Sequence, residues 1–259
     1  MDIQLFNKAL ADRKRMTGTI LVSGAPILTE AIAQSDFDVL WIDMEHSGIG
    51  IESLVNNLIA ARAGGKPAWV RIPWNDQVMA KPVLDMGADG IIFPYIRTSE
   101  EAKRAVAACA YPPEGVRGYG PLRSLDYGRI TQQEYVTKTY RNCLRIVQIE
   151  HIDAVKNLRQ IVATEGIDAF IVGPNDLSGS VGKLGQIKDP ELMALYREIG
   201  KVMSEMNKPF GVATICDPDF LRFWQSIGAS IFFVSSEVGF MYEGVKAANQ
   251  MLESIKQDN

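Results

Sequence analysis

The chain has 259 residues, 47% of them hydrophobic, and a formal net charge of −4 at pH 7. This composition is typical of a globular protein, and the mild acidity argues against a nucleic-acid binder, which would usually carry a basic excess. No run approaches the roughly 20 apolar residues that a membrane helix needs, and residues 1–14 lack the apolar core of a signal peptide. The three scattered cysteines suggest no disulfide framework, so a reducing cytoplasm is expected.

The apolar pattern alternates between short β-rich runs and longer helical stretches. An opening helix is expected over residues 3–14. Eight runs then predict strands over residues 18–22, 39–42, 68–72, 90–94, 144–149, 169–172, 210–214 and 231–235. Helices are predicted over residues 51–63, 100–110, 154–163, 191–206, 218–227 and 241–256. Residues 111–142 break this rhythm with an excursion that is long for a compact domain, where such loops are usually functional or disordered.

The alternation itself predicts the fold class. Strands that alternate with helices form parallel sheets with crossover helices. Eight such units in a chain of about the usual length favour a closed (β/α)8, or TIM, barrel over an open doubly wound sheet. No linker interrupts the pattern, so residues 1–259 are expected to form a single barrel domain with an extra helix at each end.

Ionisable residues follow several of the predicted strands, at the end where such barrels place their active sites. Side chains alternate along a strand, so Gln148 and Glu150 should face the barrel axis while Val147 and Ile149 face the helices. Glu150 and Asp176 together suit a hard divalent cation such as Mg²⁺ or Mn²⁺. The alternative is that Glu150 pairs with an arginine and that Asp176 only caps a helix.

Three further residues are candidates for chemistry, each with a structural alternative. His46 follows the second strand, where it can act as a general acid or base or be an ordinary loop residue. Arg71 lies within the third strand, so it needs an anionic partner, either a protein carboxylate or a substrate. Asp85 ends a helix, where its charge opposes the helix dipole; it either orients a basic group or is simply exposed. By contrast, His151 is expected to start a helix.

The glycine-rich stretch 115–120 lies in the long excursion. It lacks the Lys-Ser/Thr of a P-loop, and we interpret it as a mobile active-site loop with Arg117 and Arg123 as anion contacts. None of the lysines lies in a predicted strand, which disfavours an aldolase that forms an imine.

These residues occur in motifs that resemble the metal-dependent 2-oxo acid aldolases of the HpcH/HpaI family, from about residue 18 to residue 246. The motifs are Phe37-Asp38, Ile42-Asp43-Met44-Glu45-His46, Val70-Arg71, Trp74-Asn75-Asp76, Leu84-Asp85-Met86-Gly87-Ala88, Tyr111-Pro112-Pro113, Gly115-Val116-Arg117-Gly118, Gln148-Ile149-Glu150 and Gly173-Pro174-Asn175-Asp176-Leu177-Ser178.

The resemblance implies a role for each candidate residue. A divalent ion (Mg²⁺, Mn²⁺ or Co²⁺) would be bound by Glu150 and Asp176. His46 would be the catalytic base, Asp85 would raise its basicity, and Arg71 would stabilise the enolate-like transition state. The pyruvate part of the substrate would contact Gln148 and the backbone at Asn175.

The resemblance also implies an activity and an assembly. The enzyme would cleave a 4-hydroxy-2-oxo acid reversibly to pyruvate, or a related 2-oxo acid, and an aldehyde. It would form a homo-oligomer, a hexamer or a trimer of dimers, with its C-terminal helix swapped between subunits. Residues 19–22, 119–124 and 211–214 depart from the family pattern, which leaves the aldehyde open. The alternatives are a CoA-thioester lyase of the malyl-CoA type and a non-catalytic barrel that binds a carboxylate.

Overall fold

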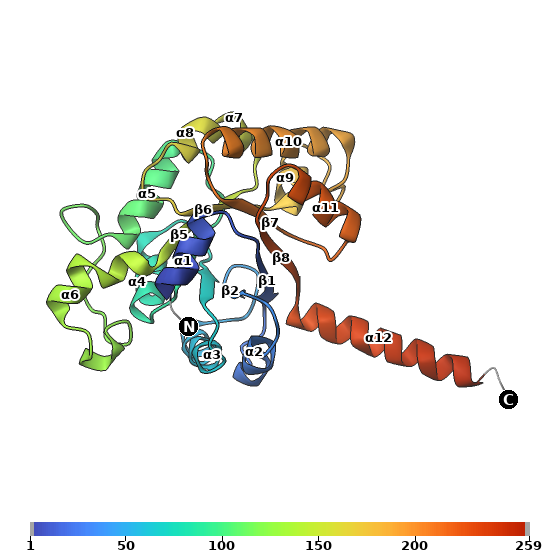
Figure 1. The fold of residues 1–259 in the computed structure, drawn as a ribbon, viewed down its shortest axis with the longest axis horizontal. Coiled ribbons are helices and arrows are strands. Elements are labelled where there is room, and N and C mark those ends of the chain that lie inside the picture. The colour runs from blue at the N-terminus through green and yellow to red at the C-terminus, as the bar shows by residue number, and fades with distance from the viewer. Residues whose placement is uncertain (1–2, 257–259) are drawn as a thin grey trace.

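The computed structural model describes residues 3–256 and shows a closed barrel of eight parallel strands in sequence order (Figure 1). The fold is therefore a (β/α)8 barrel, as the sequence predicts. The strands are β1 (Met16–Leu21), β2 (Val39–Asp43), β3 (Ala68–Arg71), β4 (Gly90–Phe93), β5 (Leu144–Ile149), β6 (Ala169–Val172), β7 (Phe210–Thr214) and β8 (Ile231–Ser236).

Most of the described helices surround the barrel in an outer ring. The described helices are α1 (Ile3–Ala11), α2 (Pro26–Ala33), α3 (Ile51–Ala63), α4 (Gln77–Asp85), α5 (Ser99–Cys109), α6 (Gln132–Thr137), α7 (Ile152–Lys156), α8 (Leu158–Val162), α9 (Pro174–Ser180), α10 (Pro190–Glu205), α11 (Pro218–Ser226) and α12 (Glu237–Lys256). Two short 3₁₀ turns, η1 (Asp126–Gly128) and η2 (Thr139–Asn142), lie in the excursion between β4 and β5.

The predicted elements agree closely with the observed ones, with two kinds of difference. All eight strands are confirmed, with ends displaced by at most two residues, whereas α2 and α6 were not predicted and α12 begins four residues earlier than predicted. The helix predicted over residues 154–163 is divided at Asn157, between α7 and α8. There the Asn157 side chain donates a hydrogen bond to the backbone oxygen of Arg97, 3.0 Å away, which ties the break to the β4–α5 loop.

The barrel interior is filled by large side chains. Trp41, Trp69 and Phe233 are fully buried there, and the Trp41 and Phe233 rings meet edge to face with centroids 5.1 Å apart. Gly18 makes room for Phe233, because a Cβ atom on Gly18 would lie 2.5 Å from that ring. At the N-terminal end, α1 covers the barrel and places Phe6 6.3 Å from the Trp69 ring. This packing closes the interior, so no channel runs through it.

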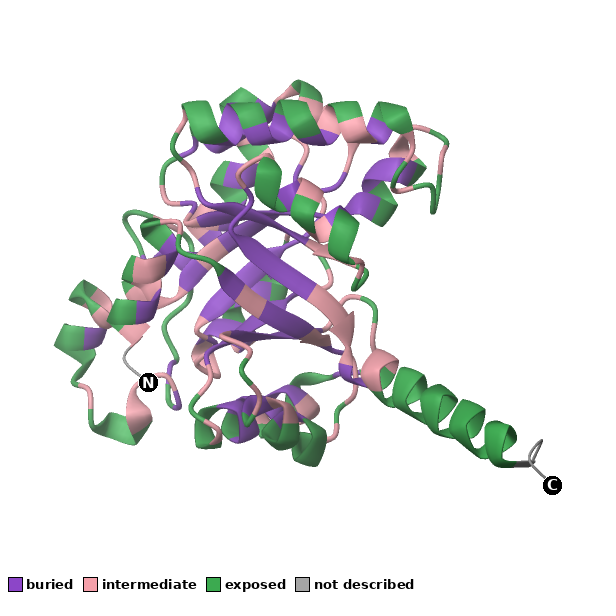
Figure 2. Ribbon diagram, turned by 45° about the vertical axis from the view of Figure 1, so that its right-hand side comes forward, coloured by how far each residue is buried: buried purple, intermediate pink, exposed green. Residues whose placement is uncertain are grey.

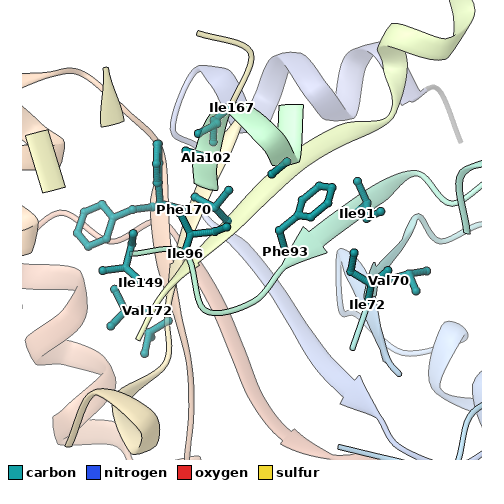
Figure 3. Packing of buried hydrophobic residues seen from close by; sticks show 14 of the residues in the cluster. Val70, Ile72, Ile91, Phe93, Ile96, Ala102, Ile149, Ile167, Phe170 and Val172 are labelled. Carbon is teal, nitrogen blue, oxygen red and sulfur yellow. The ribbon is translucent and has the colours of Figure 1, made fainter. Parts of the chain in front are cut away.

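A second core lies between the strands and the helices. Figure 3 shows Val70, Ile91, Phe93 and Ile149 among its buried side chains. Val147 and Ile149 belong to this outer core, which confirms their predicted orientation toward the helices. Gln148, on the alternate face of β5, therefore points toward the barrel axis.

The last helix does not join the ring. Figure 1 shows α12 projecting away from the barrel, and Figure 2 shows it in the colour of exposed residues along most of its length. Residues 241–255 are all exposed. Within residues 3–256, no helix is both long and apolar enough to cross a membrane.

Candidate active site

Charged side chains gather where the strands end, at the C-terminal rim of the barrel. Asp43 and Arg71 end β2 and β3 and are paired in the sheet register, and Gln148 and Glu150 lie at the end of β5. All four residues are buried, with at most 8% of their surface exposed. Charges this deeply buried need partners, so their contacts define the site.

Arg71 is held by a bidentate ion pair. Its Nε donates to Asp43 Oδ1 at 2.9 Å and its Nη2 donates to Asp43 Oδ2 at 2.6 Å. The third nitrogen, Nη1, lies 3.1 Å from Glu45 Oε2 and 3.3 Å from Gln148 Oε1. Burial opposes the charge of Arg71, but the hydrogen bonds that it donates to Asp43 and the negative charges of Asp43, Glu45 and Glu150 outweigh burial and raise the pKa above its usual value. Arg71 is therefore a fixed positive charge beside the end of β5.

Glu150 is, with Asp43, one of the deeply buried carboxylates of the rim. Its Oε1 accepts a hydrogen bond from the Tyr95 backbone N–H at 2.6 Å, and its Oε2 accepts one from Gln148 Nε2 at 2.8 Å. The pKa of Glu150 is raised to about 8: burial is the main cause, the charges of Asp176 and Glu45 act in the same direction, and the Tyr95 hydrogen bond and the charge of Arg71 oppose them.

Glu45 and His46 extend the site from the β2–α3 loop. The pKa of Glu45 is raised by burial and by the charges of Asp43 and Asp176, while Arg71 and His46 lower it. Glu45 Oε2 lies 3.8 Å from His46 Nε2, and the His46 side chain is 64% exposed. An exposed imidazole beside a half-buried carboxylate can exchange protons with a ligand at the rim.

Asn175 and Asp176 lie in the first turn of α9, directly after β6, and both are exposed. Gly173 precedes them and packs tightly against Glu150, because a Cβ atom there would lie 2.6 Å from Glu150 Oε2. The close approach of the Gly173 backbone leaves the buried carboxylate no space on that side. Asp176 influences the pKa of both Glu150 and Glu45, so these acids share one electrostatic environment at the rim.

This donor set fits a hard divalent cation. Glu150 and Asp176 offer carboxylate oxygens, the ligands that Mg²⁺ and Mn²⁺ prefer. Burial and like charge make the acids difficult to ionise in the absence of a cation, and a bound cation would remove that penalty. Among the described residues no group of three or more His, Cys, Asp or Glu side chains forms a complete metal cage, so substrate and water oxygens would have to complete the coordination.

Asp85 lies apart from the rim residues within this chain. Asp85 is the last residue of α4 and precedes β4, which places it at the N-terminal end of the barrel, whereas His46 follows β2 at the C-terminal end. Its Oδ1 accepts a hydrogen bond from Arg117 Nη2 at 2.8 Å. Within residues 3–256, no hydrogen bond or ion pair joins Asp85 to His46.

The stretch 115–120 and its arginines also lie away from the rim. Arg117 is buried in a cage of tyrosines, with its guanidinium carbon 4.8 Å from the Tyr111 ring centre, and Arg123 is buried as well. Within this chain the stretch therefore does not reach the rim, and its role as an active-site loop stays a prediction. The prediction for His151 is confirmed: it caps α7, with Nδ1 accepting the Asp153 backbone N–H at 3.1 Å.

Sequence reasoning missed the roles of Asp43, Glu45 and the Tyr95 backbone. Asp43 and Glu45 stand in the stretch Asp43-Met44-Glu45-His46, and two acids directly after a buried strand are a signal that could have identified them. Tyr95 has a left-handed backbone, with φ 58°, which turns its N–H toward Glu150. That conformation leaves no signal in the residue type, because tyrosine rarely adopts it.

Comparisons with known proteins agree with this geometry. The family model described as HpcH/HpaI aldolase/citrate lyase matches residues 17–217. A 5-keto-4-deoxy-D-glucarate aldolase of Salmonella arizonae is 34% identical over 93% of this chain and 93% of its own length. A solved HpcH/HpaI aldolase/citrate lyase family protein from Burkholderia cenocepacia superimposes with a TM-score of 0.89 at 28% identity, over 96% of this chain and 99% of that one.

A third similar protein is the solved citrate synthase SbnG, with a TM-score of 0.86 and 26% identity over 98% of each chain. The family match covers most of the chain, and the aldolase relative exceeds the identity at which membership is secure. The chain therefore belongs to the HpcH/HpaI aldolase/citrate lyase family and is a carbon–carbon lyase.

Proposed function

We propose that the protein is a divalent-metal-dependent aldolase that cleaves a 4-hydroxy-2-oxo acid to pyruvate, or a related 2-oxo acid, and an aldehyde. The observation that carries the proposal is the buried Glu150 carboxylate, which shares the rim with Asp176 and Glu45 and lies beside the fixed charge of Arg71. Divalent-metal dependence is a general property of the family. Glu150 and Asp176 are the residues proposed to hold the ion.

The rim residues divide the work of binding and charge stabilisation. The bound ion would act as a Lewis acid toward the 2-oxo acid. Arg71, fixed by Asp43, presents a preorganised positive charge where negative charge develops as the C3–C4 bond breaks. Gln148 is hydrogen-bonded to both Arg71 and Glu150, so it can fix the position of each relative to the other. It is also the side chain proposed to contact the pyruvate part of the substrate. The first turn of α9 places the Asn175 backbone at the same rim.

Proton transfer is assigned to His46. Cleavage requires removal of the proton on the C4 hydroxyl while the electrons of the C3–C4 bond pass to the pyruvate fragment. The exposed imidazole can accept that proton, and Glu45, 3.8 Å from Nε2, favours the resulting positive charge. Return of a proton to the pyruvate fragment completes the turnover.

The substrate class is narrowed by the curated relatives, which carry the name 5-keto-4-deoxy-D-glucarate aldolase. That compound is itself a hydroxylated 2-oxo diacid, and aldol cleavage would give pyruvate and tartronate semialdehyde. We therefore propose it as the first substrate to be tested. The resemblance defines the aldehyde product less closely than the pyruvate part, because β1 and β7 end in residues that depart from the family pattern.

We further propose a homo-oligomer, a hexamer or trimer of dimers, in which α12 packs on a second copy. Asp85 and His46 occupy opposite ends of one barrel, so the proposed effect of Asp85 on the base requires that second copy. The three free cysteines are in keeping with a reducing cytoplasm.

A pyruvate-release assay tests the proposed activity. Metal-depleted protein would be mixed with 5-keto-4-deoxy-D-glucarate and with shorter 4-hydroxy-2-oxo acids, with and without Mg²⁺, Mn²⁺ or Co²⁺. We expect turnover that EDTA abolishes and added ion restores. Turnover that resists EDTA and is trapped by borohydride would contradict the proposal. A malyl-CoA-type thioester run in parallel distinguishes a CoA-thioester lyase, and activity on neither class would favour a non-catalytic barrel.

A further inference from the structure

A cavity of about 540 Å³ lies at the other end of the barrel from Glu150. Its walls include Lys66, Asp89 and Cys143, which directly precede or lie near the starts of β3, β4 and β5. The remaining wall comes from the excursion between β4 and β5, including Arg117 and Arg123. The active site of such a barrel lies at its C-terminal end, so this cavity is separate from the rim site of the same chain.

The charges that line the cavity are predominantly positive. Arg62, Lys66, Arg117 and Arg123 face two acids, Asp89 and Asp126. Asp126 is already neutralised by Arg62, whose Nη2 lies 3.1 Å from its Oδ1. The other acid, Asp89, accepts the Ala68 backbone N–H at 3.0 Å at the start of β3, and burial raises its pKa.

Arg123 and Lys66 form no such ion pair, although the charge of Asp89 acts on Arg123 at longer range. Within residues 3–256, neither nitrogen group lies within 4.0 Å of a carboxylate oxygen. Arg123 is only 9% exposed and donates to the Met86 backbone oxygen, and a Cβ atom on Gly87 would lie 3.3 Å from its Nη1. A buried guanidinium held in place by neutral groups is an unusual arrangement, because buried charges are normally paired.

We propose that this cavity is a binding site for a small anionic molecule carrying a carboxylate or phosphate group. Arg123 and Lys66 would contact the anionic group, and arginine suits both anions through its planar fork of donors. The cavity volume falls within the range of roughly 300–1,000 Å³ found for small-molecule sites. The uncharged remainder of the ligand would lie against the wall formed by Leu84 and Ile130.

The site is connected to Asp85. Arg117 lines the cavity and donates to Asp85 through Nη2 at 2.8 Å, while the Ser124 backbone N–H donates to the Asp85 backbone oxygen at 3.3 Å. A ligand bound against Arg123 would therefore order the excursion and the end of α4 together. Binding is expected to stabilise the fold, because a ligand that binds only the native state raises the free energy of unfolding.

Isothermal titration of the metal-depleted, full-length protein tests the proposal, with inorganic pyrophosphate and citrate as separate probes and chloride at matched ionic strength as the blank. At least one probe should bind saturably, with one site per chain. The more effective probe distinguishes a phosphate-bearing from a carboxylate-bearing ligand. Thermal unfolding measured at the same concentrations should shift upward only with the probe that binds.

Lys66→Met and Arg123→Met should each weaken that binding by about tenfold or more, the effect of losing one charged hydrogen bond. Lys103→Met is the matched control, because Lys103 is exposed on α5 outside the cavity and should leave binding unchanged. Lys66 is half-buried without an ion pair in the described structure, so its variant remains informative if Arg123→Met does not fold. Failure of both probes to saturate, or binding that Lys66→Met leaves unaltered, would overturn the proposal.

Discussion

At the scale of single residues, the arrangement of the rim depends on ion pairs and hydrogen bonds among its own side chains. Arg71 joins Asp43, Glu45 and Gln148, and Gln148 joins Glu150, so one guanidinium orders both sides of the site. This chain of contacts explains how an arginine inside a strand is tolerated. It also means that the position of Arg71, as well as its charge, should matter for activity.

Arg71→Lys separates these two contributions. A lysine keeps the charge but cannot make the bidentate contact with Asp43 or reach Gln148 in the same geometry. We expect kcat to fall about 100-fold, the usual effect of removing one preorganised donor, with metal affinity nearly unchanged. Steady-state kinetics and Mn²⁺ titration of the same preparation measure both. A variant with wild-type kcat would show that Arg71 is only structural.

Gly173→Ala tests the close packing behind the proposed metal ligand. The added Cβ would lie 2.6 Å from Glu150 Oε2, so the carboxylate must move. We expect metal affinity to fall about 10- to 100-fold, as for changes that disturb a ligand's surroundings. Gly48→Ala is the control, since a Cβ there meets nothing within 4 Å. Equal metal affinity in the two variants would count against the placement of Glu150.

The sequence predicted those parts of this site that depend on local strand geometry. Alternation along β5 was sufficient to place Gln148 and Glu150 toward the axis, because period-two geometry is local. The partners of Arg71 were not predictable in the same way, since Asp43 reaches it only through the sheet register. The position of Asp85 was not predictable from its motif alone, because the direction of α4 returns the chain to the end of the barrel opposite His46.

At the scale of elements, the strands were predictable because a parallel sheet buries both faces. Every residue of β2, β3, β4 and β6 is buried, which gives short apolar runs that stand out in the sequence. The helix α2 was missed because its apolar residues Ile27 and Leu28 are exposed, so its pattern does not mark a buried face. The break at Asn157 depends on a bond to a distant loop and has no local signal.

Thr98→Ala tests how a loop–helix junction next to the site is held. Thr98 and Glu101 form a reciprocal capping box at the start of α5, with Thr98 Oγ1 accepting the Glu101 N–H at 3.2 Å. Its loss should lower the free energy of unfolding by about 1 kcal/mol, measured by urea denaturation. Ser99→Ala, which removes only an exposed contact to Glu100, should change it by less than about 0.5 kcal/mol. Equal effects would contradict the capping role.

At the scale of the whole molecule, α12 is the feature that one chain does not explain. Val238, Met241, Val245 and Leu252 recur at helical spacing on one face and are all exposed. This exposed apolar stripe is the surface that the proposed packing of α12 on a second copy would cover. The sequence predicted the helix itself, but its departure from the barrel was visible only in the structure.

Val245→Glu places a charge in the middle of that stripe. If α12 packs on a second copy, the variant should dissociate into smaller species, because an unpaired charge is costly at an apolar interface. Light scattering after size-exclusion chromatography measures the mass. Gln250→Glu adds the same charge on the opposite face of α12 and should leave the mass unchanged. A wild-type protein that is monomeric at micromolar concentration would rule out the proposed assembly.

The central claim is that Glu150 and Asp176 hold a divalent ion, and Mn²⁺ binding followed by electron paramagnetic resonance tests it most directly. The account predicts one bound Mn²⁺ per chain in the wild-type protein and affinity lowered by about 100-fold or more in Glu150→Gln, which keeps the size of the side chain but removes its charge. Circular dichroism would verify that the variant is folded. Unchanged Mn²⁺ affinity in a folded Glu150→Gln protein would contradict the account.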